Sequence, residues 1–365
     1  MKNKFEHLML KEIFEQTEVM ENTIEDKING NNEINFKNGG FTSEEVKNFN
    51  RIYIAACGTA FHAGLSGKIA LERFTGIPVK VNVASEFRYE QPVIDGKTLA
   101  IFISQSGETA DTLSSLALAK SKGATILVIT NVENSTMAKQ ADKVIYTMAG
   151  PELSIASTKA YTNQVLMLYL LALDMGNKND YIDNKSYLKI LEEIKLISAK
   201  ITEILDDSEL IKPMAKLTTS RPSVYFLGRY LDYVTAKEAS LKLKETSYIH
   251  AESFPAGEFK HGPIALIEDG TPVVLIATQD ELVPNMITSL KDVKANGAKT
   301  ITVIKGTNEE ISNISDYVIS LPYTMDLLTP LISIIPLQLL AYYTALELGN
   351  DVDKPRNLTK AVVIE

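Results

Sequence analysis

The chain has 365 residues, of which 45% are hydrophobic and 23% are charged. At about 150 residues per domain, this length predicts two domains, and the composition excludes a disordered or fibrous chain. The formal net charge of -9 argues against nucleic acids and anionic membranes as partners. One cysteine, Cys57, and four histidines without a Cys/His cluster exclude an internal disulfide and a structural zinc site of the usual kind. We expect a compact cytoplasmic protein that needs no metal and no cofactor.

The first 45 residues mix charged and apolar residues at helical spacing, and they lack the apolar stretch and cleavage site of a secretory signal. We expect an N-terminal helical segment that starts with an amphipathic surface helix.

The sequence then repeats itself with a shift of 174 residues: residues 98–130 align with 272–304 without a gap. In both segments an apolar strand, a polar turn, a helix and a second apolar strand follow one another. The apolar runs have little polar alternation, which is typical of parallel strands covered on both faces. The sequence therefore predicts an α/β fold with two doubly wound parallel-sheet domains. Ligands of such domains bind at the carboxyl ends of the strands.

The repeat suggests where the domains begin and end. We expect an N-terminal helical segment at 1–45, a first α/β domain at 46–182, a helical connector at 183–208, a second α/β domain at 209–350 and a C-terminal tail at 351–365.

The turn after the strand at 99–103 differs between the two copies. The first copy reads Ser104-Gln-Ser-Gly-Glu-Thr109, and a helix is expected to start near Asp111. Hydroxyls and a glycine beside the free N–H groups of a helix start can surround a phosphate without a lysine. The second copy reads Thr278-Gln-Asp-Glu-Leu-Val283, whose carboxylates would repel an anion. A Ser/Thr-rich turn is more often an ordinary helix cap, but the contrast between the copies favours a phosphate site. No Gly-Lys-Ser/Thr ending of a nucleotide P-loop is present.

Two further polar stretches stand near the ends of expected elements. Cys57-Gly-Thr59 follows the first strand and is a candidate for the same crevice, although a lone cysteine there is more often simply buried. Ser157-Thr-Lys159 precedes the helix that contains Gln164, and its alternative interpretation is a helix cap with a solvated lysine.

In the second half, an expected helix near 230–248 carries Lys242 and Glu245 on one face. Such pairs are mostly solvated, but the segment at 250–263 that follows is expected to be a loop dense in titratable groups. Within it, His261 is a candidate acid or base, because imidazole titrates near neutrality. The tail ends in apolar residues, so we expect it to dock rather than fray and to bring Lys360 into a site.

The uncharged segment at 327–346 is the one stretch that resembles a membrane span. Pro330, Pro336 and the internal repeat favour a buried loop and helix instead. The same segment supplies the candidate apolar surface for a dimer.

Six motifs follow one another along the chain. They are Cys57-Gly-Thr, Ser104-Gln-Ser-Gly-Glu-Thr-Ala-Asp-Thr112, Ala156-Ser-Thr-Lys-Ala160, Lys242-Leu-Lys-Glu245, Glu258-Phe-Lys-His-Gly-Pro263 and Pro355-Arg-Asn-Leu358. Together they resemble the isomerase part of the glucosamine-6-phosphate synthase family, which is built of two sugar isomerase (SIS) domains. The resemblance covers essentially the whole chain. The family's full enzyme also has a glutaminase domain, which we expect this chain to lack, so that glutamine is not its direct nitrogen donor.

The resemblance implies that the first SIS domain binds a phosphosugar. The residues that would hold its phosphate are Ser104, Gln105, Ser106 and Thr109. The residues that would line its sugar are Cys57, Gly58, Thr59, Ile155 and Ser157. Ala60 stands where the family usually has serine, and the missing hydroxyl removes a hydrogen bond worth about 0.5–1.5 kcal/mol.

The resemblance also implies the reaction: fructose 6-phosphate is isomerised to glucose 6-phosphate, or aminated to glucosamine 6-phosphate when ammonia is available. His261 would assist ring opening by reaching in from a neighbouring subunit, which implies a homodimer. Lys360 would form a Schiff base with the C2 carbonyl, and Glu245 would move the proton between C1 and C2 with Lys242 beside it. Because a lysine attacks only as the neutral amine, we expect desolvation or a nearby positive charge at its site.

Two other functions compete with this one. A stand-alone SIS deglycase or amino-sugar-phosphate deaminase would run related Schiff-base chemistry toward release of an amine. A non-catalytic phosphosugar sensor would keep the phosphate turn and lose the chemistry. The presence of His261 and Lys360 in their motifs favours the isomerase over the deglycase, and Glu245 with them argues against a sensor.

Overall fold

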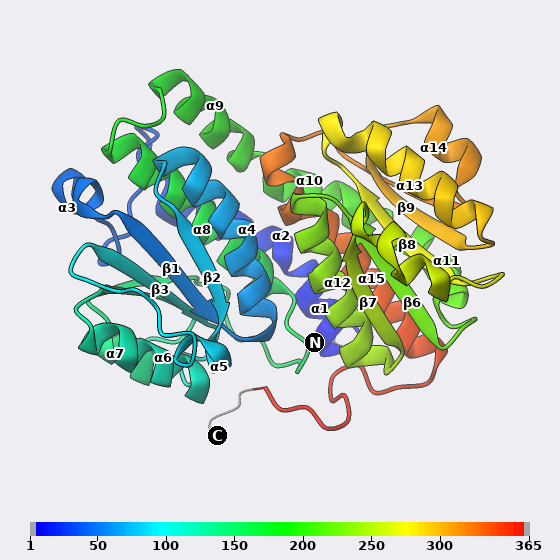
Figure 1. The fold of residues 1–365 in the computed structure, drawn as a ribbon, viewed down its shortest axis with the longest axis horizontal. Coiled ribbons are helices and arrows are strands. Elements are labelled where there is room, and N and C mark those ends of the chain that lie inside the picture. Colours follow the sequence, from blue (N-terminus) through cyan, green and yellow to red (C-terminus); the bar gives the residue numbers. More distant parts are fainter. Residues whose placement is uncertain (1–4, 361–365) are drawn as a thin grey trace. The chain divides into compact units, whose positions relative to one another are not determined.

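The structure, a computed structural model, describes residues 5–360 and contains two parallel five-stranded sheets flanked by helices (Figure 1). The first sheet has the order β2-β1-β3-β4-β5 and the second has the order β10-β9-β8-β6-β7. The predicted doubly wound α/β fold with two copies is therefore confirmed. The strands are β1 (Arg51–Ala56), β2 (Val79–Val83), β3 (Thr98–Ser104), β4 (Thr125–Thr130), β5 (Lys143–Tyr146), β6 (Ser223–Gly228), β7 (His250–Pro255), β8 (Pro272–Ala277), β9 (Lys299–Lys305) and β10 (Tyr317–Leu321).

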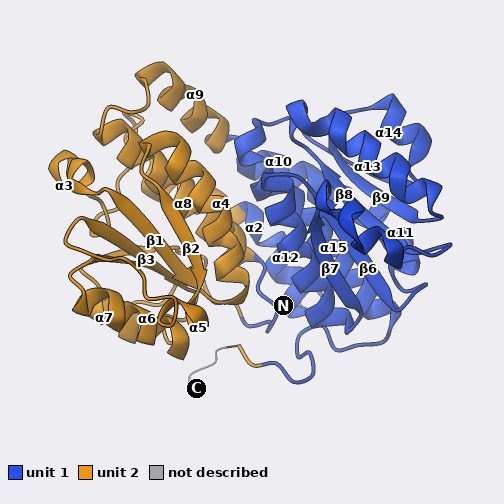
Figure 2. Ribbon diagram, in the orientation of Figure 1, with its two compact units in different colours: residues 1–17, 153–158, 196–358 blue, residues 18–152, 159–195, 359–365 orange. Residues whose placement is uncertain are grey.

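The chain divides into two compact units, which Figure 2 colours separately. Unit 1 comprises the chain up to Thr17, residues 153–158 and residues 196–358, and it contains the second sheet. Unit 2 comprises residues 18–152 and 159–195 and the chain from Thr359 on, and it contains the first sheet. The five segment boundaries expected from the sequence stay a prediction.

In unit 2, the first sheet has helices on both faces, with α4 and α8 on one side and α5, α6 and α7 on the other (Figure 1). Successive residues of β3 serve the two faces in turn. Phe102 packs in a core cluster with Phe87 and Leu116, whereas Ile103 approaches Gly64 of α4. The helices of this unit are α3 (Ser43–Asn48), α4 (Gly58–Thr75), α5 (Ala84–Phe87), α6 (Ala110–Ser121), α7 (Thr136–Gln140), α8 (Lys159–Lys178) and α9 (Asn184–Lys195).

Unit 1 repeats this plan around the second sheet. One core cluster joins Tyr225 and Leu275 of the sheet to Leu290 of α13. Residues 250–255, which were expected in a loop, form the edge strand β7, because their backbone pairs with β6 in parallel register. The helices are α10 (Ile197–Asp206), η1 (Ser208–Ile211), α11 (Lys212–Thr218), α12 (Leu231–Ser247), η2 (Glu258–His261), η3 (Pro263–Leu266), η4 (Asp280–Leu282), α13 (Val283–Ala295), α14 (Glu309–Ile314), η5 (Asp326–Leu328) and α15 (Thr329–Glu347).

The N-terminal segment is helical and amphipathic, as expected. It forms α1 (Leu8–Phe14) and α2 (Gln16–Lys27), in which Met9, Ile13 and Met20 are 0% exposed, whereas Lys11, Glu18, Glu21 and Glu25 are exposed. Glu12 of α1 is also buried, and its carboxylate accepts hydrogen bonds from backbone N–H groups of unit 1 at residues 153 and 154.

The uncharged segment at 327–346 is a core helix. Among the described residues, one helix, Asp326–Glu347, is long and apolar enough to cross a membrane, and its most apolar 18-residue window is 100% buried in the protein. Pro330 lies in the first turn of α15, where its missing N–H costs nothing, and Pro336 is accommodated inside the helix. The expected burial is confirmed. The suggestion that this segment offers a dimer surface is wrong, because all its side chains except that of Leu346 are already buried.

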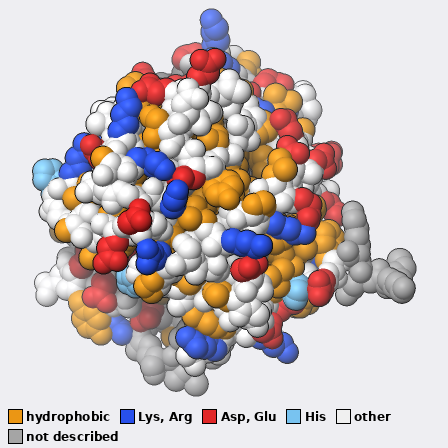
Figure 3. Space-filling view, turned by 90° about the vertical axis from the view of Figure 1, so that its right-hand side faces the viewer, with side chains coloured by type: hydrophobic (Ala, Val, Ile, Leu, Met, Phe, Trp, Pro, Cys, Tyr) orange, Lys and Arg blue, Asp and Glu red, His pale blue; other side chains and the backbone are white. Residues whose placement is uncertain are grey.

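The face of the molecule in Figure 3 carries acidic and basic side chains interspersed with hydrophobic ones. It shows no single-sign basic field of the kind that attracts nucleic acid.

Candidate functional site

The polar turns of unit 2 lie where the first sheet reverses its strand order. In the order β2-β1-β3-β4-β5 the reversal falls between β1 and β3, and ligands of open α/β sheets bind at such a point. Ala56 is paired with Ile103 in register, so Cys57 and Ser104 leave the sheet next to each other. The structure thus brings together two groups of residues that the sequence separates by more than 40 positions.

A network of hydroxyls holds the turn between β3 and α6. Ser104 Oγ lies 2.9 Å from Thr109 Oγ1 and 3.4 Å from Ser106 Oγ, and it accepts the Gly107 N–H at 3.0 Å. Ser106 Oγ accepts the Glu108 N–H at 3.2 Å. Ser104 is buried, whereas Gln105, Ser106 and Thr109 are partly exposed. The turn is a group of linked hydroxyls, of which those of Ser106 and Thr109 are on partly exposed residues.

Thr109 is the N-cap residue of α6, yet its side chain makes no capping hydrogen bond. Its hydroxyl is directed to Ser104 instead. The alternative interpretation of this turn as an ordinary side-chain cap does not describe the structure. A helix of this length leaves its first N–H groups for another acceptor, and the helix dipole favours an anion there.

Gly107 gives the turn its shape. Its φ is +67°, in the left-handed region, and a side chain there would collide with Ser135 Oγ and Cβ. Ser135 is itself fixed as the N-cap of α7, where its hydroxyl accepts the Ala138 N–H. The position accepts only glycine without rearrangement.

Cys57, Gly58 and Thr59 form the start of α4. Burial raises the pKa of the Cys57 thiol, and its sulfur lies 3.9 Å from Thr112 Oγ1, so the group is a neutral thiol at neutral pH. Gly58 is exposed with a φ of +54°, and Thr59 is partly exposed. These residues can line a ligand, but the thiol is not an activated nucleophile.

The equivalent turn of the second copy, in unit 1, is closed by the chain's own carboxylates. Asp232 of α12 accepts the Thr278 N–H at 2.8 Å and also the Thr278 hydroxyl, and Asp326 accepts the Asp280 N–H at 3.0 Å. Lys305 forms ion pairs with Asp280 and Asp326. Carboxylate oxygens thus occupy the backbone donors here, which fits the expectation that this copy does not take an anion.

A buried charge cluster on α12 contains two of the predicted catalytic residues. Lys242 is 0% exposed, and its Nζ lies 2.5 Å from Glu245 Oε2 and 3.4 Å from Glu238 Oε1. The side chain of Glu238 is 0% exposed, whereas that of Glu245 is 21% exposed. The pair is therefore not a solvated surface pair. Sequence reasoning missed Glu238, although its position four residues before Lys242 places it on the same face.

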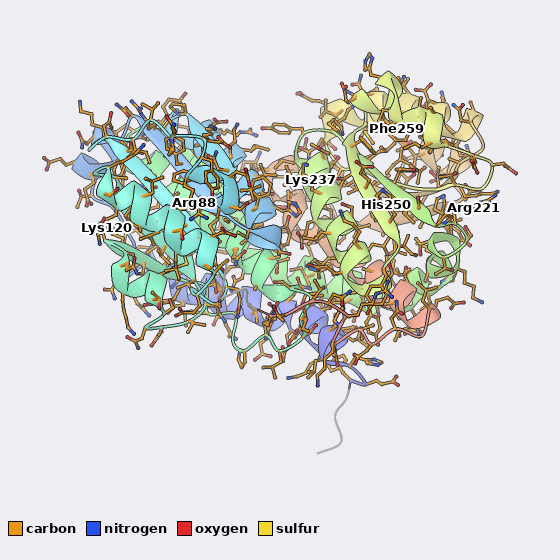
Figure 4. The ribbon with its side chains drawn as sticks, turned by 60° about the horizontal axis from the view of Figure 1, so that its bottom comes forward. Arg88, Lys120, Arg221, Lys237, His250 and Phe259 are labelled. Carbon is orange, nitrogen blue, oxygen red and sulfur yellow. The ribbon has the colours of Figure 1, made fainter. Side chains whose placement is uncertain are left out.

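The other predicted residues of unit 1 are less enclosed. His261 is exposed at the end of η2, in a segment anchored by the buried Phe259, which packs 5.8 Å from Tyr225 and 5.4 Å from Phe254 between ring centroids. Figure 4 labels Phe259 and shows it in unit 1 with His250 at the start of β7. Ile155 and Ser157 are partly exposed.

Lys360 lies within unit 2, where its Nζ donates a hydrogen bond of 2.6 Å to Glu152 Oε2. This neighbour was not predicted from the sequence, and it is negative where desolvation or a positive charge was expected. Lys159 of the third polar stretch is buried, so the interpretation of that stretch as a cap with a solvated lysine is wrong.

No group of three or more His, Cys, Asp or Glu among residues 5–360 could hold a metal ion. A cavity of about 1010 Å³ opens in unit 1 between α11, α15 and the region of β10, with Lys212, Lys216 and Tyr343 in its wall. None of the predicted site residues, all of which lie within 5–360, lines it.

Comparisons with known proteins identify the family of the chain. Residues 45–174 and 216–348 match the model of the SIS domain. The chain is 47% identical over 364 residues to a glutamine–fructose-6-phosphate aminotransferase (isomerizing) of Caldanaerobacter subterraneus subsp. tengcongensis and 46% identical to one of Clostridium tetani. Each match covers 100% of this chain and 60% of the relative, so the chain spans about three fifths of these proteins.

Solved structures with the same fold support this comparison. The C-terminal domain of glucosamine-fructose-6-phosphate aminotransferase from Francisella tularensis superposes with a TM-score of 0.91 at 36% identity, covering 97% of this chain and 100% of that one. Glucosamine-6-phosphate deaminase from Thermotoga maritima superposes with a TM-score of 0.77 at 22% identity, covering 98% and 100%. At that identity the second likeness supports the fold alone.

Proposed function

The chain belongs to the SIS domain family, and we propose that it is the sugar isomerase part of a glutamine–fructose-6-phosphate aminotransferase. It binds fructose 6-phosphate and isomerises it to glucose 6-phosphate, and with ammonia it forms glucosamine 6-phosphate. The names of the relatives that match the whole chain support this activity. The likeness to the Francisella tularensis domain, at 36% identity, supports it further.

The observation that carries the proposal is the hydroxyl turn at the start of α6. Ser104, Ser106 and Thr109 converge on a helix start whose N-cap side chain makes no capping bond. A phosphate there accepts N–H and O–H hydrogen bonds and is stabilised by the helix dipole. Gln105 stands in the same turn, and the sugar carbons follow toward Cys57, Gly58 and Thr59, which leave the neighbouring strand.

The proposed chemistry uses the acid–base groups that the sequence motifs supply. Glu245 carries the proton between C1 and C2, which its partial exposure permits, and the buried Lys242 lies beside it at 2.5 Å. His261 assists ring opening, and Lys360 forms the imine at C2. Ile155 and Ser157 contact the sugar.

We propose a cytoplasmic homodimer, in which His261 reaches the site of the neighbouring subunit. The exposure of His261 in its own subunit supports this arrangement. Mixing His261→Gln with Glu245→Gln protein tests it: two inactive variants regain activity only if the two residues of one site come from different subunits.

Product analysis by NMR and mass spectrometry tests the activity. The 365-residue chain is incubated with fructose 6-phosphate alone, with ¹⁵N-ammonium, or with ¹⁵N-amide glutamine. Glucose 6-phosphate in the first mixture and ¹⁵N-glucosamine 6-phosphate in the second are expected, with glutamine giving no labelled product. The variant Glu245→Gln, which lacks the proposed proton-transfer group, is the control for contaminating activity. If the wild-type chain turns over nothing in any mixture, the proposal fails.

The deglycase or deaminase remains the competing function. Incubation with fructosamine 6-phosphate and glucosamine 6-phosphate, followed by measurement of released ammonia or amine, separates the two. Release without isomerisation of fructose 6-phosphate would favour the competitor.

A further inference from the structure

Glu152 is held at two points. Its side chain is 0% exposed, Oε2 accepts the Lys360 ammonium at 2.6 Å, and Oε1 accepts the backbone N–H of Ala160 at 3.1 Å. Ala160 is the second residue of α8, so this N–H belongs to the first turn of a 20-residue helix. The positive end of the helix dipole stabilises the carboxylate there. Glu152 is therefore held rigidly by the protein. Its partner Lys360 is 27% exposed and lies in the irregular chain after α15.

The second copy has a lysine–carboxylate pair at the corresponding place. The shift of 174 residues puts Glu152 on Asp326, which also precedes the last long helix of its copy. Asp326 pairs with Lys305. This location in the fold thus brings a carboxylate and an ammonium together in both copies, in units that fold around separate sheets.

The two pairs differ in where the lysine comes from. Lys305 is the last residue of β9, its side chain is 2% exposed, and it also pairs with Asp280. These carboxylates raise the pKa of Lys305 against the effect of its burial. At the matching place after β4 the first copy has Asn131, and the ammonium is supplied by Lys360 from more than 200 residues away. Lys305 is thus held by its strand and by two carboxylates, whereas Lys360, which takes its place in the first copy, lies in irregular chain.

We propose that Glu152 is a positioning residue for Lys360, which anchors its ammonium in the resting protein and accepts its proton when the amine attacks a sugar carbonyl. This inference rests on the proposed function, in which Lys360 forms the imine. Because Glu152 is buried, the neutral pair of carboxylic acid and amine is less disfavoured than it would be in water. Glu152 thus offers the lysine a proton acceptor.

The step balances in protons and charge. Nζ passes one proton to Glu152 Oε2, and its lone pair forms the C–N bond at C2 of the open-chain ketose. The C=O π electrons move to oxygen, and a proton passes from nitrogen to that oxygen, which gives a carbinolamine. The Glu152 proton then goes to the hydroxyl, which leaves as water. A protonated imine remains beside the regenerated Glu152 carboxylate, so the pair again carries one positive and one negative charge.

Borohydride trapping tests the role directly. The 365-residue chain is mixed with fructose 6-phosphate and cyanoborohydride between pH 6 and 9.5, and the reduced adduct on Lys360 is quantified by peptide mass spectrometry. In Glu152→Gln we expect the plateau trapping rate to fall about 100-fold. Glu152→Asp, which keeps a carboxylate at this position, restores part of the rate.

The matched control is Asp174→Asn, which removes another buried carboxylate paired with a lysine, Lys178, at the far end of the same helix. It should leave the trapping rate unchanged, so a general loss of stability in α8 is separated from the proposed role. An unchanged rate in Glu152→Gln, with a normal wild-type adduct, overturns the inference and leaves the proposed function standing. A wild type that yields no Lys360 adduct overturns both. If Glu152→Gln does not fold, the trapping rate of Glu152→Asp is compared with that of the wild type. Equal rates reject the positioning role.

Discussion

Thr109 Oγ1 and Ser104 Oγ lie 2.9 Å apart across the turn between β3 and α6. This bond directs the threonine away from the helix cap, whose usual acceptor is therefore absent from the first turn of α6. The proposed phosphate site rests on this arrangement, and the first prediction follows from it.

Replacing a hydroxyl of this turn should weaken substrate binding without changing the chemistry. For Ser106→Ala and for Thr109→Val we expect KM for fructose 6-phosphate to rise about tenfold to 100-fold, because a hydrogen bond to a charged group is worth about 1.5–3 kcal/mol. The kcat should change little. The control is Ser121→Ala, at the other end of α6. Steady-state kinetics decide, and a fall in kcat at constant KM would contradict the phosphate role.

Gly107→Ala should damage the same turn by a steric route. The added methyl meets Ser135, and the left-handed φ of +67° adds strain. Gly123→Ala is the matched control, because Gly123 also has a positive φ, +89°, but open space around the new methyl. We expect Gly107→Ala to lose more stability and more substrate affinity than Gly123→Ala, as measured by thermal unfolding and calorimetric titration. Equal effects would mean that the collision is relieved at no cost.

Glu245→Gln should stop proton transfer while substrate still binds. Positioned acid–base groups contribute about 100-fold to 10,000-fold, so we expect kcat for isomerisation to fall by that amount. Binding of fructose 6-phosphate should stay near the wild-type value. Solvent deuterium exchange at C1 and C2, followed by NMR, reports the step itself. Exchange at the wild-type rate would assign the proton transfer to another residue.

The α12 cluster should matter for stability as well. Lys242→Met leaves Glu238 and Glu245 without their buried counter-ion, and breaking such a pair costs about 3–5 kcal/mol. Urea unfolding followed by circular dichroism measures this cost. The exposed Lys244 on the same helix gives the control Lys244→Met. The double variant Lys242→Met, Glu238→Gln should recover part of the loss, and a loss that only grows would show that the two residues act independently.

Asp232 predicts a specific pH dependence of stability. Complete burial raises its pKa from 3.8 to about 6, against the hydrogen bonds from Thr278 that favour the carboxylate. The folded protein therefore holds this proton more tightly than the unfolded chain, and this group's contribution to the free energy of unfolding falls as pH rises from about 4 to about 6. The fall amounts to about 3 kcal/mol and is complete above that range.

Asp232→Asn removes this dependence. The difference between the wild-type and variant unfolding free energies, measured in urea from pH 4 to 8, should change through this window and be flat above it. Asp206→Asn, at an exposed position in the same unit, should give a flat difference throughout. A flat curve for Asp232→Asn would show that its carboxyl titrates normally.

Much of the fold and part of the site could be predicted because their signals are local. The apolar runs of strand length and the 174-residue repeat follow from the periodicity and duplication of the sequence, and they determine two parallel sheets. In such a fold the chain after β1 and the chain after β3 must meet, so Cys57 and Ser104 could be placed together from sequence alone. The buried strand residues need no tertiary knowledge either, since a strand covered on both faces must be apolar throughout.

Only the tertiary structure determines the pairings between charges and the burial of whole helices. Glu152 and Lys360 are 208 positions apart, and no periodicity links them, because their contact depends on the path of the chain after α15. The sequence could not show that Asp232 closes the second copy's turn, nor that Glu12 of α1 accepts backbone N–H groups at residues 153 and 154. Buried polar groups are placed by the partners that compensate their lost hydration, and those partners exist only once the chain has folded.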